Sequence, residues 1–129
     1  MKISHVERGR WAEAMAAAFL LLRGYRILDR NFRFGRLEID LIARRDRVLA
    51  IVEVKYRESS RRGGASAAVG RRKQADLETA AVGYLRMRGL AGVTVRFDVV
   101  AVEAADGDGG TLILRHLPGA FQATGRYRA

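Results

Sequence analysis

Residues 37–43 read LEIDLIA and residues 48–57 read VLAIVEVKYR, and the four-residue polar turn RRDR separates these two apolar runs. Runs of this length and composition, bounded by a polar turn, predict two β-strands paired as an antiparallel hairpin. Asp40, Glu53 and Lys55 interrupt the apolar runs. A charge in a strand that is buried on both faces is destabilising unless something pairs with it. These three residues therefore need a partner that their apolar neighbours do not supply.

The pattern on either side of this hairpin predicts a mixed α/β (α+β) domain with the element order α-β-β-β-α-β-β. Ala, Leu, Met and Glu dominate residues 10–23, which predicts a helix, and residues 25–34 have the pattern of a strand. We expect a second helix over 71–88 and two further strands over 93–103 and 111–116. A helix between the third and fourth strands allows them to run parallel, which gives a mixed sheet with helices packed on it.

Length and composition predict one domain over residues 1–129, with loose ends at 1–8 and 122–129 and a mobile loop over 58–70. No apolar run approaches the roughly 20 residues of a membrane span, and the N-terminus lacks the apolar core of a signal peptide. We therefore expect a cytoplasmic protein that does not enter the membrane. The absence of cysteine excludes disulfides, thiolate catalysis and zinc–cysteine sites.

The chain carries a formal net charge of +10, and nearly all of its cations are arginines. This balance favours a polyanionic partner, because guanidinium groups match phosphate oxygens and phosphate binding releases counterions. Nucleic acid is the expected partner, and a general effect of arginine-rich composition on solubility is the alternative. The first turn of the second predicted helix also gathers cations that the helix dipole disfavours, which again suggests an anionic partner. The candidate nucleic-acid-binding residues are Arg57, Arg61, Arg62, Arg71, Arg72, Lys73 and Gln74.

The acidic side chains of the hairpin have the pattern of a metal site. Glu53 and Lys55 leave the same strand face, and a reasonable hairpin register brings Asp40 beside Glu53. Two carboxylates and a backbone carbonyl make an all-oxygen site for Mg²⁺ or Mn²⁺, and a nearby lysine can stabilise charge on a phosphate or orient a water. Glu13, on an inner stripe of the first helix, is a further candidate metal ligand. Weaker candidates for the same site are Glu38 and Asn31.

Each of these residues also has a purely structural interpretation. Glu53 and Lys55 would then form a same-face ion pair, and Asp40 would pair with a nearby arginine. Glu13 would be a first-turn acid that the helix dipole favours. An E-x-K triplet alone is a weak signal, but Asp40 upstream, Glu13 on a helix and a strongly basic chain give a nuclease-type metal site equal weight with the structural interpretation.

This ordered set of residues resembles the PD-(D/E)xK nuclease superfamily and, within it, the YraN-like family, which is related to archaeal Holliday-junction resolvases. The resemblance covers most of the chain, from about Gly9 to Phe121. This chain has Ala12 and Leu37 where the family usually has glycine. The residues that carry the resemblance are Glu13-x-x-Ala16-x-x-Phe19-Leu20, Gly24-Tyr25, Arg30-Asn31, Glu38-Ile39-Asp40-Leu41-Ile42, Val52-Glu53-Val54-Lys55-x-Arg57, Lys73 and Arg96-Phe97-Asp98-Val99-Val100.

The resemblance implies a restriction-endonuclease-like fold, a central mixed sheet flanked by helices, with Glu13, Asp40, Glu53 and Lys55 as the active site. It also implies metal-dependent phosphodiester hydrolysis, so we expect a Mg²⁺- or Mn²⁺-dependent DNA endonuclease whose substrates include branched DNA. A junction resolvase would act as a homodimer to make paired cuts. The alternatives are a nucleic-acid-binding module with a nuclease-like fold that does not cut, and a protein-interaction domain with an arginine-rich surface.

Overall fold

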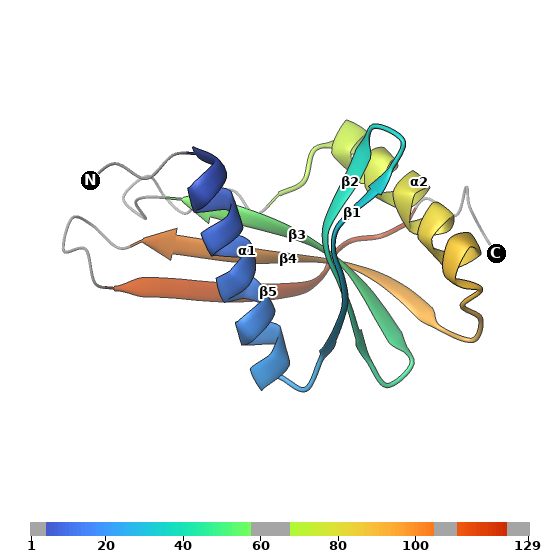
Figure 1. The fold of residues 1–129 in the computed structure, drawn as a ribbon, viewed down its shortest axis with the longest axis horizontal. Helices are drawn as coiled ribbons and strands as arrows, with labels where there is room; N and C mark the ends of the chain where they lie inside the picture. The colour runs from blue at the N-terminus through green and yellow to red at the C-terminus, as the bar shows by residue number, and fades with distance from the viewer. Residues whose placement is uncertain (1–4, 58–67, 105–110, 124–129) are drawn as a thin grey trace.

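The computed structural model describes residues 5–57, 68–104 and 111–123. Within these residues, seven elements follow one another in the order that the sequence predicts, and Figure 1 shows how they are arranged. The elements are α1 (His5–Leu22), β1 (Arg26–Phe34), β2 (Leu37–Arg45), β3 (Val48–Arg57), α2 (Arg71–Arg88), β4 (Thr94–Ala104) and β5 (Leu112–Phe121).

The five strands form one mixed sheet in the order β1-β2-β3-β4-β5. Strands β1, β2 and β3 pair antiparallel, β3 and β4 pair parallel, and β4 and β5 pair antiparallel. The parallel pair forms because the chain crosses over through α2 between these two strands, so both can point the same way. The fold class expected from the sequence is therefore confirmed.

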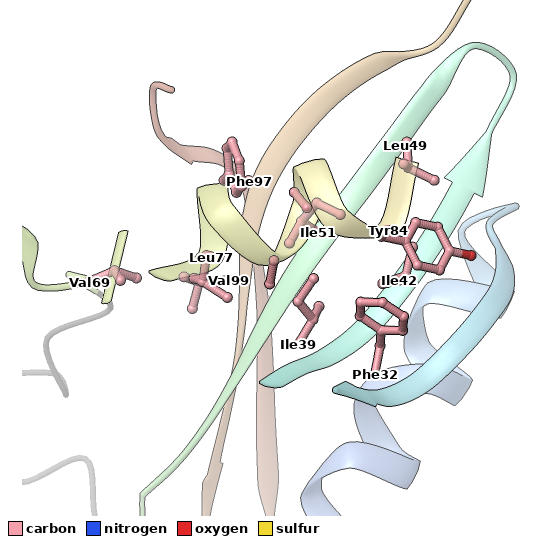
Figure 2. Packing of buried hydrophobic residues seen from close by; sticks show 12 residues of the cluster. Phe32, Ile39, Ile42, Leu49, Ile51, Val69, Leu77, Tyr84, Phe97 and Val99 are labelled. Atoms are coloured by element: carbon pink, nitrogen blue, oxygen red, sulfur yellow. The ribbon is translucent and has the colours of Figure 1, made fainter. Parts of the chain in front are cut away.

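The two helices pack against two separate hydrophobic cores of the sheet. The inner face of α1 consists of small residues and one leucine, which let the helix lie close to β2, β3 and β4; these residues are Ala12, Ala16, Ala17 and Leu20. In the other core, Leu77 and Tyr84 of α2 pack with residues such as Ile51 and Phe32, as Figure 2 shows. Within the part of the chain that the structure describes, neither helix is long and apolar enough to cross a membrane.

Strand β2 changes its surroundings along its length. Its second half pairs with β3, from Leu41 opposite Val52 to Arg45 opposite Val48. Its first half continues to pair with β1, up to Leu37 at the end of the hairpin. The β1–β2 hairpin therefore separates from β3 at Asp40 and rises beside α2 (Figure 1).

The β1–β2 hairpin packs against α2 at Gly83. The ring of Phe34 lies so close that a Cβ atom on residue 83 would be 2.4 Å from two of its carbon atoms. One residue further along α2, the ring of Tyr84 packs edge-on against Phe32, with 5.0 Å between the ring centroids. These contacts fix the hairpin against α2, and so they fix the place where β2 and β3 separate.

The start of α1 differs from the prediction. The sequence predicts a loose arm over residues 1–8 and a helix from Arg10, whereas α1 begins at His5. Glu7 lies in the first turn of α1, where the helix dipole favours an acidic residue. The predicted arm is therefore partly helical, and residues 1–4 lie outside the described residues.

Strand β5 is also longer than predicted, because it continues past His116 to Phe121. Gly119 allows this, since it has a φ of 64° and its backbone N–H donates a hydrogen bond to Asp98. The β4–β5 register shifts between Phe97 and Val99, the kind of irregularity that a β-bulge introduces. Most of the predicted loop over 58–70, the predicted turn before β5 and the end of the tail lie outside the described residues.

Candidate active site between two strands

At the point where β2 leaves β3, the side chain of Asp40 provides the hydrogen-bond acceptor that a neighbouring strand would supply. Its Oδ2 accepts a hydrogen bond of 2.8 Å from the backbone N–H of Val54. The last paired residues before this point are Leu41 and Val52. A backbone N–H beyond the paired region still needs an acceptor, and Asp40 is held in place by satisfying that need.

Glu53 lies beside Asp40, where the hairpin register is expected to place it. Burial, a hydrogen bond with the Glu53 side chain and the charge of Glu53 raise the pKa of Asp40 from 3.8 to about 8. The hydrogen bond from Val54 opposes this shift, and the charge of Glu13 adds to it. Two carboxyl groups this close do not both ionise readily without a cation. The carboxyl group of Asp40 therefore keeps its proton near neutral pH in the metal-free protein.

Glu13 approaches this pair from α1. Its Oε1 accepts a hydrogen bond of 2.8 Å from the Nδ2 group of Asn31, on β1. Asn31 has a φ of 51°, a left-handed conformation that asparagine adopts more readily than most residues. The weaker candidate Asn31 thus orients the stronger candidate Glu13, and a hairpin strand and a helix contribute to one site.

Two candidate lysines lie on different elements, and Lys73 of α2 is the one that contacts the pair, whereas Lys55 of β3 bonds to the segment just before α2. The Nζ atom of Lys73, in the first turn of α2, is 3.6 Å from Oε2 of Glu53. The Nζ atom of Lys55 donates a hydrogen bond of 2.6 Å to the backbone carbonyl of Ala68, just before α2. The structural interpretation of the sequence predicts an ion pair between Glu53 and Lys55. In the described residues, Glu53 instead pairs with Lys73.

The remaining candidates lie around this centre. Glu38 pairs with Arg33 across the hairpin at 3.4 Å. Gln74 donates a hydrogen bond of 2.7 Å to the carbonyl of Val69, which fastens the start of α2. The exposed cations near the two ends of this region are Arg57, Arg71 and Arg72. The other two predicted nucleic-acid contacts, Arg61 and Arg62, lie outside the described residues.

The donor set suits a hard divalent cation that takes few protein ligands. Across the described ranges, no three His, Asp or Glu side chains are gathered closely enough to hold a metal ion by themselves. Mg²⁺ does not require such a group, because it is commonly held by one or two carboxylates and completes its shell with water and substrate phosphates. The touching carboxyl groups of Asp40 and Glu53, with Glu13 nearby, fit that mode of binding.

A buried polar cluster centred on Asp98 was not expected from the sequence. The side chain of Asp98 has no exposed surface and accepts hydrogen bonds from Arg96 at 2.7 and 2.8 Å, and from the backbone N–H of Gly119 at 3.0 Å. Nε2 of His116 lies 2.8 Å from Asp98, and Arg96 also donates to the hydroxyl of Tyr25. The spacing of Arg96 and Asp98 on one strand face is the only part of this cluster that the sequence signals.

These features define a class of protein, a mixed α+β domain with an acidic pair where two strands of its sheet separate. A model of the Uncharacterised protein family UPF0102 matches residues 12–102. A UPF0102 protein of Anaeromyxobacter dehalogenans is 44% identical over 118 residues, which cover 92% of this chain and 86% of the relative. For a UPF0102 protein of Syntrophotalea carbinolica, the identity is 41% over 125 residues, covering 97% of this chain and 99% of the relative.

A UPF0102 protein of Moorella thermoacetica is 44% identical over 102 residues, which cover 79% of this chain and 85% of the relative. The chain belongs to the UPF0102 family. The resemblance to the YraN-like family that the sequence motifs indicate is therefore confirmed.

Proposed function

We propose that this protein is a metal-dependent endonuclease that hydrolyses phosphodiester bonds in DNA at the Asp40–Glu53 pair. The observation that carries the proposal is the half-buried pair that the carboxyl groups of Asp40 and Glu53 form where β2 and β3 separate. Burial, with the hydrogen bond and the charge of Glu53, raises the pKa of Asp40 to about 8. An arrangement that forces two acids together is destabilising in the fold alone. A bound divalent cation would offset that repulsion, so the pair is stable when it serves as a metal site.

Asp40 and Glu53 would hold the cation, Mg²⁺ or Mn²⁺, and Glu13 would support it directly or through water. A bound cation of this kind stabilises charge that develops on a phosphate and makes a nearby water a better nucleophile. Asn31 holds the side chain of Glu13 through its 2.8 Å hydrogen bond. The protein's own contribution is therefore a set of oxygen donors held by a helix and two strands.

Lys55 and Lys73 would bind the substrate phosphate beside the cation. A lysine ammonium has three N–H donors, so the bond from Lys55 to Ala68 leaves two donors for a phosphate oxygen or a water. Lys73 is partly exposed at 44%, so its ion pair with Glu53 is weak enough to exchange for a phosphate.

The exposed Arg57, Arg71 and Arg72 would hold the DNA backbone on either side. We also propose that the enzyme acts in the cytoplasm, where bacterial DNA lies.

A cleavage assay tests this proposal. Four-way junction, flap and single-stranded DNA are incubated with Mg²⁺ or Mn²⁺ and with wild-type protein, Asp40→Ala or Glu53→Ala. We expect each substitution to lower the cleavage rate about 100-fold or more. Glu38→Ala is the matched control, because it removes an acid of the same strand that pairs with Arg33, and it should retain cleavage. Cleavage that persists in both test variants would overturn the site.

A second candidate function is a nucleic-acid-binding module that does not cut. The observation that favours it is the lack of a third acidic side chain within metal-binding reach, in the residues that the structure describes. Such a module would bind DNA equally well with and without Mg²⁺, and Asp40→Ala would not weaken binding. Paired cuts in a four-way junction would instead select a junction-cleaving enzyme, which must act as a two-fold homodimer.

A further inference from the structure

An arginine-lined pocket lies at the end of the sheet where β1 begins and β2 turns into β3. It has a volume of about 560 Å³ and is lined by Gly24, Arg26, Arg44, Arg45 and Asp46. Along β2, Arg44 is four residues from Asp40, which corresponds to about 13 Å of extended strand. The pocket is thus separate from the Asp40–Glu53 pair.

Two of these arginines stand directly opposite one another. Arg26 and Arg44 are paired residues of the antiparallel β1–β2 ladder, and like charges at such positions destabilise a sheet. Within the described residues, no carboxylate forms an ion pair with Arg26, Arg44 or Arg45. Asp46 is the acidic residue of the lining, but it meets Arg44 through its backbone carbonyl, which accepts a 3.0 Å hydrogen bond from Nε.

The third arginine is held firmly in place. Nη1 of Arg45 donates a hydrogen bond of 3.1 Å to the carbonyl of Arg23, at the end of α1. Its guanidinium group also lies over the ring of Tyr25, 4.6 Å from the centroid. Tyr25 is buried, and its hydroxyl accepts a hydrogen bond from Arg96. Arg45 is therefore pre-positioned, and most of its five N–H donors remain available.

We propose that this pocket binds a phosphate dianion, either free phosphate or the terminal phosphate of a nucleic-acid strand. The three arginines and one aspartate among the lining residues carry a formal charge of about +2, which matches the charge of about −2 on a terminal phosphate near neutral pH. A guanidinium group can donate two parallel hydrogen bonds to two oxygens of one phosphate. A bound dianion also relieves the repulsion between Arg26 and Arg44. This site does not depend on the proposed nuclease activity.

Calorimetric titration of the full chain with inorganic phosphate tests the proposal. The test variant is Arg26→Gln/Arg44→Gln. The matched control is Arg30→Gln/Arg36→Gln, which removes two exposed cations from the same hairpin outside the pocket. We expect saturable binding that weakens at least roughly 10-fold in the test variant and less than about 2-fold in the control. The test variant should melt no lower than wild type without phosphate, because it removes a repulsive pair.

A second arm separates the two sources of phosphate. A single-stranded oligonucleotide is titrated with and without a 5′-phosphate. If wild type prefers the phosphorylated strand and the preference disappears in Arg26→Gln/Arg44→Gln, the pocket binds strand ends. If wild type binds inorganic phosphate but shows no such preference, the pocket binds free phosphate. The proposal is overturned by equal losses in the test and control variants, or by wild-type protein that neither binds inorganic phosphate saturably nor prefers the phosphorylated strand. If the double variant does not fold, Arg26→Gln alone replaces it.

Discussion

The Oδ2 atom of Asp40 lies 2.8 Å from the backbone nitrogen of Val54 and accepts its hydrogen bond, just beyond the last paired residues of β2 and β3. One carboxyl group thus has two tasks. It satisfies a backbone donor where the strands separate, and it forms half of the acidic pair with Glu53. The same residue therefore links the shape of the sheet to the proposed chemistry.

Asp40 should make the stability of the metal-free protein depend on pH. Its pKa is about 8 in the fold, against an ordinary 3.8. The unfolded chain thus loses this proton first, and the free energy of unfolding should fall as pH rises from about 4 to about 8, by at most about 1.4 kcal/mol per unit. Asp40→Asn keeps an acceptor for Val54 without a titrating proton, so its stability should vary less over this range. Urea unfolding at several pH values measures both.

The charged groups that act on Asp40 are Glu53 and Glu13, and Lys73 is paired with Glu53. Because a bound cation would offset the repulsion between these carboxyl groups, added Mg²⁺ provides a control for the pH dependence. Added Mg²⁺ should raise the stability of wild type most at high pH, where Asp40 has lost its proton. It should have little effect on Asp40→Asn. A wild-type stability that stays level from pH 4 to pH 8, or that rises, would contradict the raised pKa of Asp40.

Asn31 should affect catalysis through Glu13. Asn31→Gly keeps the left-handed backbone but removes the amide that donates to Glu13, so cleavage should fall roughly 10-fold while stability changes by at most about 1 kcal/mol. Glu13→Gln should produce a similar loss. Because the two residues act together, the double variant should lose little more than either single variant. Full additivity of the two losses in the cleavage assay would show that Asn31 does not act through Glu13.

Gly83 should be needed for the hairpin to pack on α2. Alanine stabilises a helix interior by about 1 kcal/mol relative to glycine, but at residue 83 its Cβ would lie 2.4 Å from the ring of Phe34. Gly83→Ala should therefore lower the free energy of unfolding by about 1–2 kcal/mol. In a Phe34→Ala background the same substitution should be stabilising. A urea-denaturation double-mutant cycle measures the coupling, and a stabilising Gly83→Ala in the wild-type background would contradict the clash.

Asp98 should stabilise the fold as a charged group. Burial alone would raise the pKa of Asp98, but hydrogen bonds from Arg96, His116 and Gly119 outweigh it, so the pKa lies below its ordinary 3.8. The stabilisation is therefore present above pH 4 and is lost as the pH falls through the lowered pKa. Asp98→Asn leaves Arg96 without its counter-charge and should cost about 3 kcal/mol at pH 7.

Urea unfolding at pH 7 and at pH 3 measures this effect. The difference between wild type and Asp98→Asn should be smaller at pH 3, because the carboxyl group of Asp98 in the unfolded chain, with its ordinary pKa of 3.8, is mostly protonated at that pH. Equal stability of the two proteins at pH 7 would contradict a charged, stabilising role for Asp98.

Local patterns were enough to predict the framework of this fold. The bounds of α2 match the prediction of 71–88, because its apolar face and the glycine that follows it are both visible in the sequence. The parallel pairing of β3 and β4 follows from the helix between them. Asp40 and Glu53 could be placed side by side because a short turn fixes the register of a hairpin.

Contacts that depend on three-dimensional packing could not be predicted in the same way. The bond between Asn31 and Glu13 depends on how α1 crosses the sheet, and the contact between His116 and Asp98 depends on a shifted β4–β5 register. The arginine-lined pocket also depends on where the ends of several elements meet. No pattern of residue spacing contains that information, so the sequence shows the charged residues without showing which of them meet.

The central claim is that Asp40 and Glu53 together hold a divalent cation. Crystals of the protein soaked in Mn²⁺ test it most directly, because anomalous scattering locates the ion whether or not a suitable DNA substrate has been found. We expect a peak between the carboxyl groups of Asp40 and Glu53 in wild type and no peak in Asp40→Asn. Wild-type crystals without a peak at this pair, or a peak that persists unchanged in Asp40→Asn, would contradict the claim.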